Sequence, residues 1–115
     1  YTPPSGTTMV KYEFHFHHGY VDNLPLTHIK FYVAGVAATK QTTTVSDEQP
    51  ATARFLVPIG GVADAATGRQ ATWTGAKELK CTITAHGSGN EGKIHDRYYP
   101  STGLVIPSLT ITSYG

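Results

Sequence analysis

The chain is poor in cysteine, methionine, tryptophan and charge. It has one each of the first three residues, and charged side chains make up 15% of its 115 residues. The single cysteine, Cys81, excludes a disulfide bond within the chain. No stretch approaches the roughly 18 consecutive apolar residues of a membrane-spanning helix, so we expect no membrane insertion. Lysine and arginine form no cluster and the formal net charge is +1, which argues against a nucleic-acid partner.

Threonine, with 17 copies, and glycine, with 12, take the place of the missing charges. A polar surface of hydroxyl groups favours strands, because threonine is β-branched and its side chain is stiff. Such a weakly charged surface is typical of proteins that work outside cells or in a particle, so we expect an extracellular, cell-surface or virion location. The length suits a single domain over 1–115, with a flexible N-terminal leader at 1–8 that contains two prolines.

Hydrophobic periodicity predicts an all-β fold. Apolar and polar residues alternate in the N-terminal stretch "VKYEFHFH", and the same period of two recurs in 79–86 and 109–112. Glycine and proline interrupt the sequence so often that no long helix can form, although 62–66 has room for one helical turn. We therefore predict a single antiparallel β-sandwich, immunoglobulin-like or jelly-roll, with roughly seven or eight strands.

Two further stretches predict strands of a particular kind. The stretch 27–37 is apolar at even and odd positions alike, which indicates a strand that is covered on both faces or bent at Gly35. The stretch 51–59 ends near Pro58, and because proline cannot donate a hydrogen bond to a neighbouring strand, we expect this end at a sheet edge or a bulge. The core of the sandwich is expected to contain Phe14, Phe16, Phe31 and Phe55.

Three of the six histidines lie within four residues, in the stretch "HFHH". His15 and His17 are two apart on the polar face of the predicted strand, so their Cα atoms are about 6.6 Å apart and their rings share a side. Such a pair can hold Zn²⁺ or Cu²⁺, but the sequence nominates no third ligand. We therefore expect a solvated strand face here, with a metal site at His15 and His17 as the alternative.

No constellation of catalytic residues is visible in the sequence. Cys81 falls on the apolar side of its predicted strand, which denies the thiol the exposed, electropositive setting that a nucleophile needs. The glycine-rich stretch 86–92 is not followed by a helix, so it is expected to be a hairpin connection and not a phosphate-binding loop. We predict that the protein is not an enzyme and takes no cofactor.

Several aromatic residues fall in turn-rich segments, where exposed rings can stack on sugars or anchor protein interfaces. The stretch "HDRYYPST" is the densest mixture of charge and aromatics and is typical of a binding loop. This pattern predicts a carbohydrate-binding module or lectin whose ligand site comprises Trp73, His95, Asp96, Arg97, Tyr98 and Tyr99. The alternative is that these rings cap the ends of the sandwich.

Self-assembly is the leading functional expectation. Terminal strands of a sandwich usually lie at sheet edges, where unpaired backbone groups invite another chain. This argument places the strand 9–17 and the C-terminal strand 104–114 at edges, and a neighbouring subunit would contact the first of them at Val10, Tyr12, Phe14 and Phe16. The sequence thus predicts a structural module of an extracellular fibre, adhesin or virion surface that binds itself or a protein or glycan surface. A carbohydrate-binding module and a histidine-based metal-binding sandwich stay open as alternatives.

Overall fold

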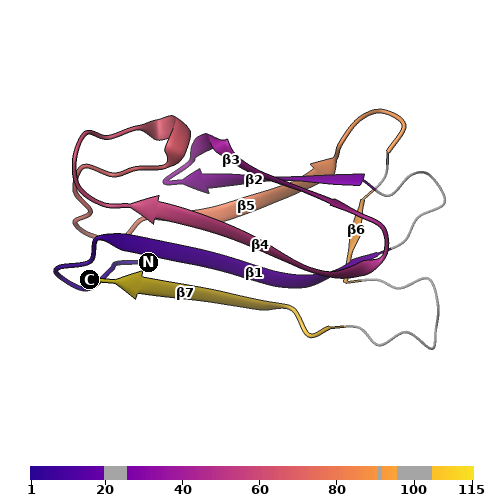
Figure 1. The fold of residues 1–115 in the computed structure, drawn as a ribbon, viewed down its shortest axis with the longest axis horizontal. Helices are drawn as coiled ribbons and strands as arrows, with labels where there is room; N and C mark the ends of the chain where they lie inside the picture. The colour runs from indigo at the N-terminus through magenta and orange to yellow at the C-terminus, as the bar shows by residue number, and fades with distance from the viewer. Residues whose placement is uncertain (20–25, 91, 96–104) are drawn as a thin grey trace.

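The computed structural model describes residues 1–19, 26–90, 92–95 and 105–115, and this part of the chain forms two antiparallel sheets packed face to face (Figure 1). We call them the β1 sheet and the β2 sheet after their central strands. The β1 sheet contains β4 (Gln49–Pro58), β1 (Met9–Gly19), β6 (Lys93–Ile94) and β7 (Ser108–Tyr114). The β2 sheet contains β3 (Val36–Ser46), β2 (Leu26–Val33) and β5 (Leu79–Ala85). The predicted β-sandwich is confirmed.

Strand β1 lies in the interior of its sheet. It pairs with β4 from Met9 to His18 along one side, and with β7 from Met9 to His15 along the other, where β6 then continues the pairing. The prediction that 9–17 forms an edge strand is therefore wrong. The alternation of apolar and polar residues shows which side chains of β1 face the core. It does not show whether β1 has one neighbouring strand or two. The residues expected to contact a neighbouring subunit, Val10, Tyr12, Phe14 and Phe16, instead face the β2 sheet, and of these only Phe14 is less than fully buried.

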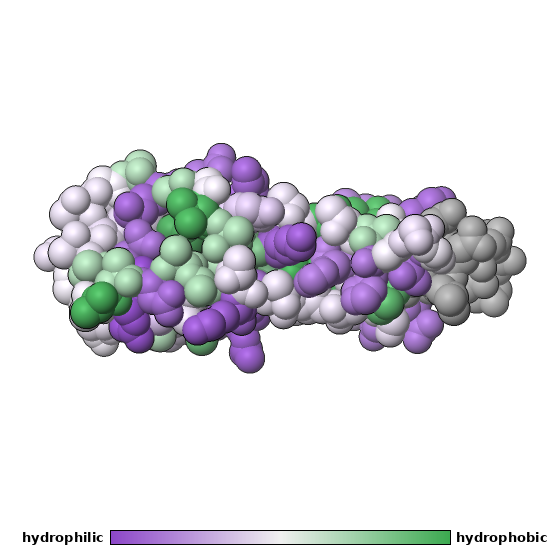
Figure 2. All heavy atoms as spheres, turned by 90° about the horizontal axis from the view of Figure 1, so that it is seen from above, coloured by the Kyte–Doolittle hydropathy of each residue, from purple (hydrophilic) through white to green (hydrophobic). Residues whose placement is uncertain are grey.

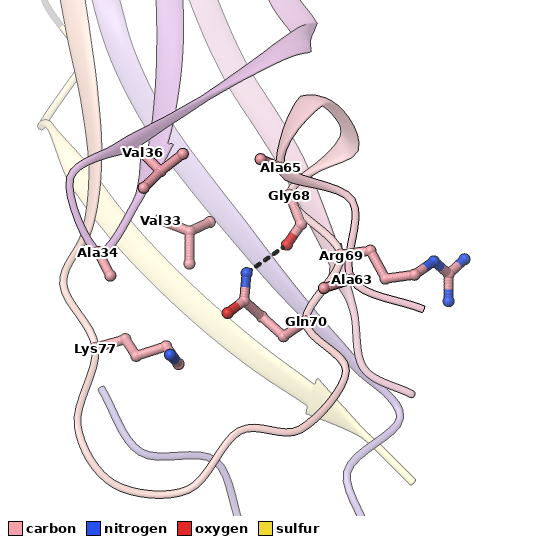
Figure 3. A pocket seen from close by; sticks show the side chains of 9 residues that line it. All are labelled: Val33, Ala34, Val36, Ala63, Ala65, Gly68, Arg69, Gln70 and Lys77. Carbon is pink, nitrogen blue, oxygen red and sulfur yellow. Dashed lines mark hydrogen bonds between the residues drawn. The ribbon is translucent and has the colours of Figure 1, made fainter. Parts of the chain in front are cut away.

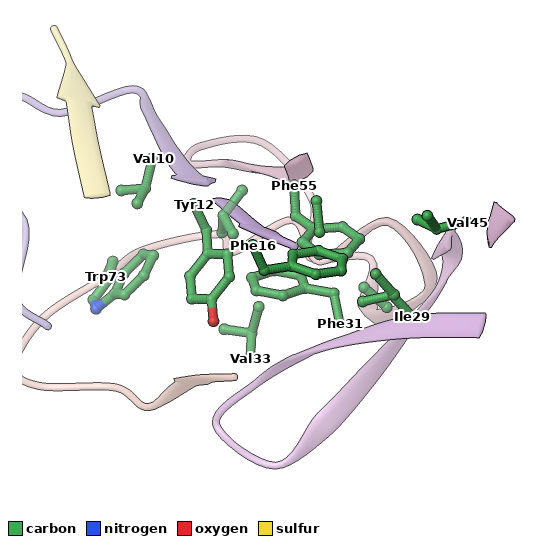
Figure 4. Packing of buried hydrophobic residues seen from close by; sticks show 12 residues of the cluster. Val10, Tyr12, Phe16, Ile29, Phe31, Val33, Val45, Phe55 and Trp73 are labelled. Carbon is green, nitrogen blue, oxygen red and sulfur yellow. The ribbon is translucent and has the colours of Figure 1, made fainter. Parts of the chain in front are cut away.

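The centre of the core is a stack of aromatic rings contributed by both sheets (Figure 4). Phe31 from β2 stacks on Phe55 from β4 with ring centroids 4.6 Å apart and planes 5° apart. Tyr12 from β1 lies against both rings, at centroid distances of 5.3 and 6.2 Å. Such ring pairs contribute roughly 0.5–1.5 kcal/mol each beyond the area that they bury. The stack therefore fixes the spacing of the two sheets.

A tight turn joins β2 to β3. Strand β2 ends at Val33 and β3 begins at Val36, so the two-residue turn consists of Ala34 and Gly35, whose φ angles are +49° and +79°. Two positive φ angles at the central residues define a type I′ turn, which matches the twist of the flanking strands. The stretch 27–37 was expected to form one strand that is covered on both faces or bent at Gly35. It instead contains most of β2, the turn and the first residues of β3. Alanine at the first turn position is strained, because its Cβ crowds the following carbonyl in this conformation.

The side of the sandwich formed by β3 and β4 is closed. A link of two residues carries the chain from β3 in one sheet to β4 in the other. Farther along this side, the Gln41 side chain on β3 donates from Nε2 to the carbonyl of Leu56 (2.5 Å) and to that of Thr67 (2.6 Å), and its Oε1 accepts from the Leu56 N–H (2.9 Å). One amide therefore joins β3 to β4 and to the loop beyond it. We call this the closed side.

The long connection from β4 to β5 contains one short 3₁₀ turn, η1 (Ala65–Thr67), as expected from its alanine-rich sequence. Asp64 caps this turn by accepting from the Ala66 N–H and the Thr67 hydroxyl, each at 3.0 Å. The hydrogen bond from the Thr67 side chain is the main cause of a lowered pKa of Asp64, because it stabilises the charged carboxylate. Within the described ranges no helix is long and apolar enough to cross a membrane.

The residues before β1 are held at both ends. The Tyr1 amine donates to the carbonyl of Lys77 (2.9 Å) and the Lys77 N–H donates to the carbonyl of Tyr1 (3.0 Å). At the other end, the N–H of Thr8 donates to the carbonyl of Tyr114 (2.7 Å). The leader expected to be flexible thus runs from the start of β5 to the end of β7, and it contacts both sheets.

Replacing Ala34 with Asn is expected to stabilise the protein by about 1 kcal/mol, because asparagine tolerates the left-handed conformation that costs alanine about that much. The opposite change in the same turn, Gly35→Ala, is expected to destabilise it. Equilibrium unfolding in urea measures both. An Ala34→Asn protein that unfolds at a lower urea concentration than the original would contradict the strained type I′ turn.

Gln41→Ala is expected to lower the free energy of unfolding by roughly 1–3 kcal/mol, because it strips the Leu56 N–H and two carbonyls of their partners. The neighbouring exposed residue offers a control, since Thr39→Ser removes only a methyl group from the solvent side of the same strand. Thermal unfolding followed by circular dichroism distinguishes the two. Equal losses in both variants would mean that Gln41 does not close this side.

Candidate functional site

Strand β5 has one neighbour: it pairs with β2, and no other strand of the described chain joins it. Two hydrogen bonds show which of its backbone groups face β2. The Ala34 N–H donates to the carbonyl of Glu78 (2.8 Å), and the His86 N–H donates to the carbonyl of Leu26 (2.9 Å). Because backbone groups alternate in direction along an antiparallel strand, even-numbered residues from 78 to 86 face β2 and odd-numbered ones face outward.

The outward backbone groups of β5 are occupied at one position only. Those of Lys77, just before the strand, are taken by Tyr1, which exchanges both hydrogen bonds as an antiparallel partner does. Apart from a backbone hydrogen bond between Cys81 and the Tyr12 hydroxyl, the four outward-facing residues that follow have no hydrogen-bond partner for their N–H and C=O groups in the ranges that the structure describes. These are Leu79, Cys81, Ile83 and Ala85.

The side chains of β5 on the core side are incompletely covered. Cys81 lies opposite Phe31 and Ile83 opposite Ile29 in the pairing with β2, so both point toward the β1 sheet, yet both are only partly buried. The Tyr12 hydroxyl donates to Cys81 Sγ across the gap between the sheets at 3.7 Å. Burial raises the pKa of Tyr12, so its hydroxyl stays protonated and remains a donor.

Strand β7 shows the same incomplete cover from the other sheet. Leu109 lies opposite Phe14 and Ile111 opposite Tyr12, so both β7 side chains face the core. Leu109 is nevertheless 54% exposed, and Phe14 and Ile111 are only partly buried. The corresponding residues on β4, at the closed side, are fully buried: Ala53, Phe55 and Val57.

The exposed apolar residues and the unpaired edge lie on one side of the molecule. Because β1 and β2 are central and β3 and β4 form the closed side, β5 and β7 both lie on the opposite side. We call it the open side, and define it as the outward edge of β5 with the core-facing residues Phe14, Cys81, Ile83, Leu109 and Ile111. Sequence reasoning missed this site, although alternation had placed Cys81, Ile83, Leu109 and Ile111 on the apolar faces of their strands.

The histidines of β1 have different surroundings. His15 is partly exposed and its Nδ1 lies 2.9 Å from the Thr52 hydroxyl. His17, on the same face, is only 1% exposed, and its Nε2 lies 3.3 Å from Glu48 Oε1. The expected solvated face therefore holds for His15 and is wrong for His17, whose ring is enclosed beside the largely buried Glu48 side chain.

His18 is completely buried and joins three segments. Its Nδ1 lies 2.6 Å from the carbonyl of Asp47, and since a carbonyl only accepts, Nδ1 carries the proton. Its Nε2 lies 2.6 Å from the hydroxyl of Thr27, which is itself buried. The ring thus ties β1 to the β3–β4 link and to β2. In the part of the chain with described coordinates, no group of three or more histidine, cysteine, aspartate or glutamate residues is arranged to hold a metal ion.

The predicted sugar-binding residues are only partly within the described chain. Trp73 is 8% exposed, its indole N–H donates to the carbonyl of Gly75 (3.1 Å), and Tyr1 packs edge-on against it at 6.2 Å. The expectation of an exposed stacking platform is therefore wrong for Trp73, which belongs to the core. His95 is exposed and packs edge-on to Phe14 at 6.0 Å. The remaining residues of that predicted site lie outside the described residues: Asp96, Arg97, Tyr98 and Tyr99.

A small pocket of about 230 Å³ lies between the β2–β3 turn and the η1 loop (Figure 3). Its walls are largely apolar, and the Gln70 side chain inside it donates to the carbonyl of Gly68 (3.0 Å). The surface in Figure 2 shows hydrophobic residues gathered at this end, where Val36 and Val62 are 55% and 87% exposed. The lining carries no carboxylate, imidazole, thiol or hydroxyl, and its charged side chains are those of Arg69 and Lys77.

Comparison of the chain with protein-family models, with curated proteins and with solved structures finds no match.

His18→Ala is expected to lower the free energy of unfolding by roughly 2–4 kcal/mol, because it leaves a cavity and deprives the buried Thr27 hydroxyl and the Asp47 carbonyl of their partner. His15→Ala, which removes a half-exposed ring from the same strand, is expected to change it by no more than about 0.5 kcal/mol. Urea unfolding of both variants provides the comparison. Similar stability losses in the two proteins would show that the structural distinction between these histidines is wrong.

Proposed function

We propose that this protein is a non-enzymatic structural module that associates with further copies of itself through the open side. The observation that carries the proposal is the coincidence of two features there: an unpaired strand edge on β5, and core-facing apolar residues that stay exposed, above all Leu109. An additional strand would satisfy the first and cover the second. Each half-exposed leucine of this kind contributes about 1 kcal/mol when it is fully buried.

The edge of β5 has one of the features that normally prevent strand addition, the lysine Lys80, and lacks the others. Proteins protect edges with proline, bulges or inward-pointing charges. Strand β4 has Pro50 and Pro58, whereas β5 has no proline and pairs with β2 without a bulge. The charge of Lys80 points to the outer face and is accompanied by Glu78 at 3.5 Å. Strand β5 is therefore open to a partner that arrives in the plane of its sheet.

The low charge and the wealth of threonine and glycine support a place in an extracellular fibre, an adhesin or a virion surface. The two alternatives have less support. The carbohydrate-binding alternative is weakened because Trp73 is buried and its ring is not available to stack on a sugar. A metal-binding sandwich would need His15 and His17 together, but one is half-exposed and the other is enclosed beside Glu48.

Leu109→Lys is expected to weaken self-association by about tenfold or more, because it removes an apolar contact from each copy and places a charge where the partner strand would lie. The matched control is Leu56→Lys, which changes an exposed leucine on the outer face of the same sheet, away from the open side. Sedimentation velocity over a concentration series measures the association of both.

The intact protein is expected to form concentration-dependent oligomers, and the Leu56→Lys variant to match it. Circular dichroism establishes that both variants keep the strand spectrum. An intact protein that sediments as a monomer at its highest soluble concentration would overturn the proposal, as would equal weakening by the two substitutions.

A further inference from the structure

We infer that the strand added at the open side is β5 of a second copy, paired antiparallel about a twofold axis that passes through Thr82. The inference rests on the proposed self-association and specifies its partner and register. A twofold arrangement uses the same edge on both copies, so each satisfies the other with one interface. Three steps lead from the described contacts to this register.

The first step concerns the direction of the backbone groups. Only the odd-numbered residues of β5 face outward, so hydrogen-bonded pairs across the interface must join an odd residue to an odd residue. Within a twofold antiparallel pair this leaves three central positions for the axis. These positions are Cys81, Thr82 and Ile83.

The second step uses Tyr1 to choose among the three. An axis at Cys81 would place the partner's Ala85 opposite Lys77, where Tyr1 is already hydrogen-bonded. An axis at Ile83 would leave Leu79 without a partner, because the opposite residue lies beyond the end of the strand. An axis at Thr82 pairs Leu79 with the partner's Ala85 and Cys81 with the partner's Ile83, so all four outward residues on each copy are satisfied.

The third step is the fit of the side chains in this register. The core-facing side chains of the partner's β5 extend the apolar face of the sheet, on the side where Leu109 is exposed. On the outer face, Thr82 meets the partner's Thr82, a favourable cross-strand pair. Lys80 lies opposite the partner's Thr84, so no like charges are directly opposed. The result is a continuous sheet of six strands through a closed dimer.

Disulfide trapping tests the register with a matched pair of variants. In a Cys81→Ser background, Thr82→Cys places one thiol on the axis, where Cα atoms of a non-hydrogen-bonded pair are about 4.5 Å apart and within disulfide range. Thr84→Cys in the same background is the control, because its thiols would be about 13 Å apart, four residues along the strand. Mild oxidation is expected to convert the first protein into a covalent dimer and to leave the second uncoupled on a non-reducing gel.

A charge pair supplies a second test that needs no cysteine. Thr82→Lys sets two like charges against each other at the axis and is expected to weaken the dimer several-fold in sedimentation, whereas Thr84→Glu, which places a carboxylate opposite the partner's Lys80, is expected to leave it at least as strong. The inferred register is overturned if both cysteine variants form the disulfide equally, or if Thr82→Lys does not weaken the dimer. Either result would still be compatible with self-association. An intact protein that is monomeric throughout overturns both the register and the proposed function.

Discussion

The stacking of Phe31 on Phe55 is the contact on which the arrangement of the two sheets depends. One ring comes from the central strand of the β2 sheet and the other from the β4 edge of the β1 sheet, so the stack joins the sheets toward the closed side. Tyr12 extends it by one ring toward the opposite side and reaches Cys81 there. Beyond Tyr12 the core is lined by the smaller, non-aromatic side chains of β5 and β7. Its packing is consequently tight at β4 and incomplete at β5 and β7.

The two sheets are connected by different kinds of interaction on the two sides of the sandwich. On the closed side, the short β3–β4 link and the Gln41 amide replace the backbone pairing that two separate sheets cannot make. His18 reinforces the same link from within by binding the carbonyl of Asp47. On the open side the described connections between the sheets are the weak hydrogen bond from Tyr12 to sulfur and the leader, which joins Lys77 to Tyr114. The described residues therefore join the two sheets more firmly on the closed side than on the open side.

The sequence predicted the class of fold and most strands because both follow from local patterns. Alternation identified β1, β5 and β7. Strand β4 is at the edge of its sheet, but the edge expected at Pro58 is covered there by Gln70, whose N–H donates to the Pro58 carbonyl. Which strands become neighbours depends on contacts between distant residues, and this is why the edge position of β1 was wrong. The burial of His17 and Trp73 was missed for the same reason, since neither residue type nor spacing shows which distant residues cover a side chain. The open side was missed because it is defined by a strand edge that has no neighbour among the described residues.

The pairing of Tyr1 with Lys77 has a consequence for any polypeptide joined ahead of Tyr1. In an antiparallel pair the residue before Tyr1 would lie beside Glu78, and the one before that opposite the outward groups of Leu79. An added N-terminal peptide is therefore directed along the free edge of β5, where it would act as an internal strand and compete with any other chain. An addition at the opposite terminus leaves that edge accessible, since Tyr114 is hydrogen-bonded to Thr8 beside β1.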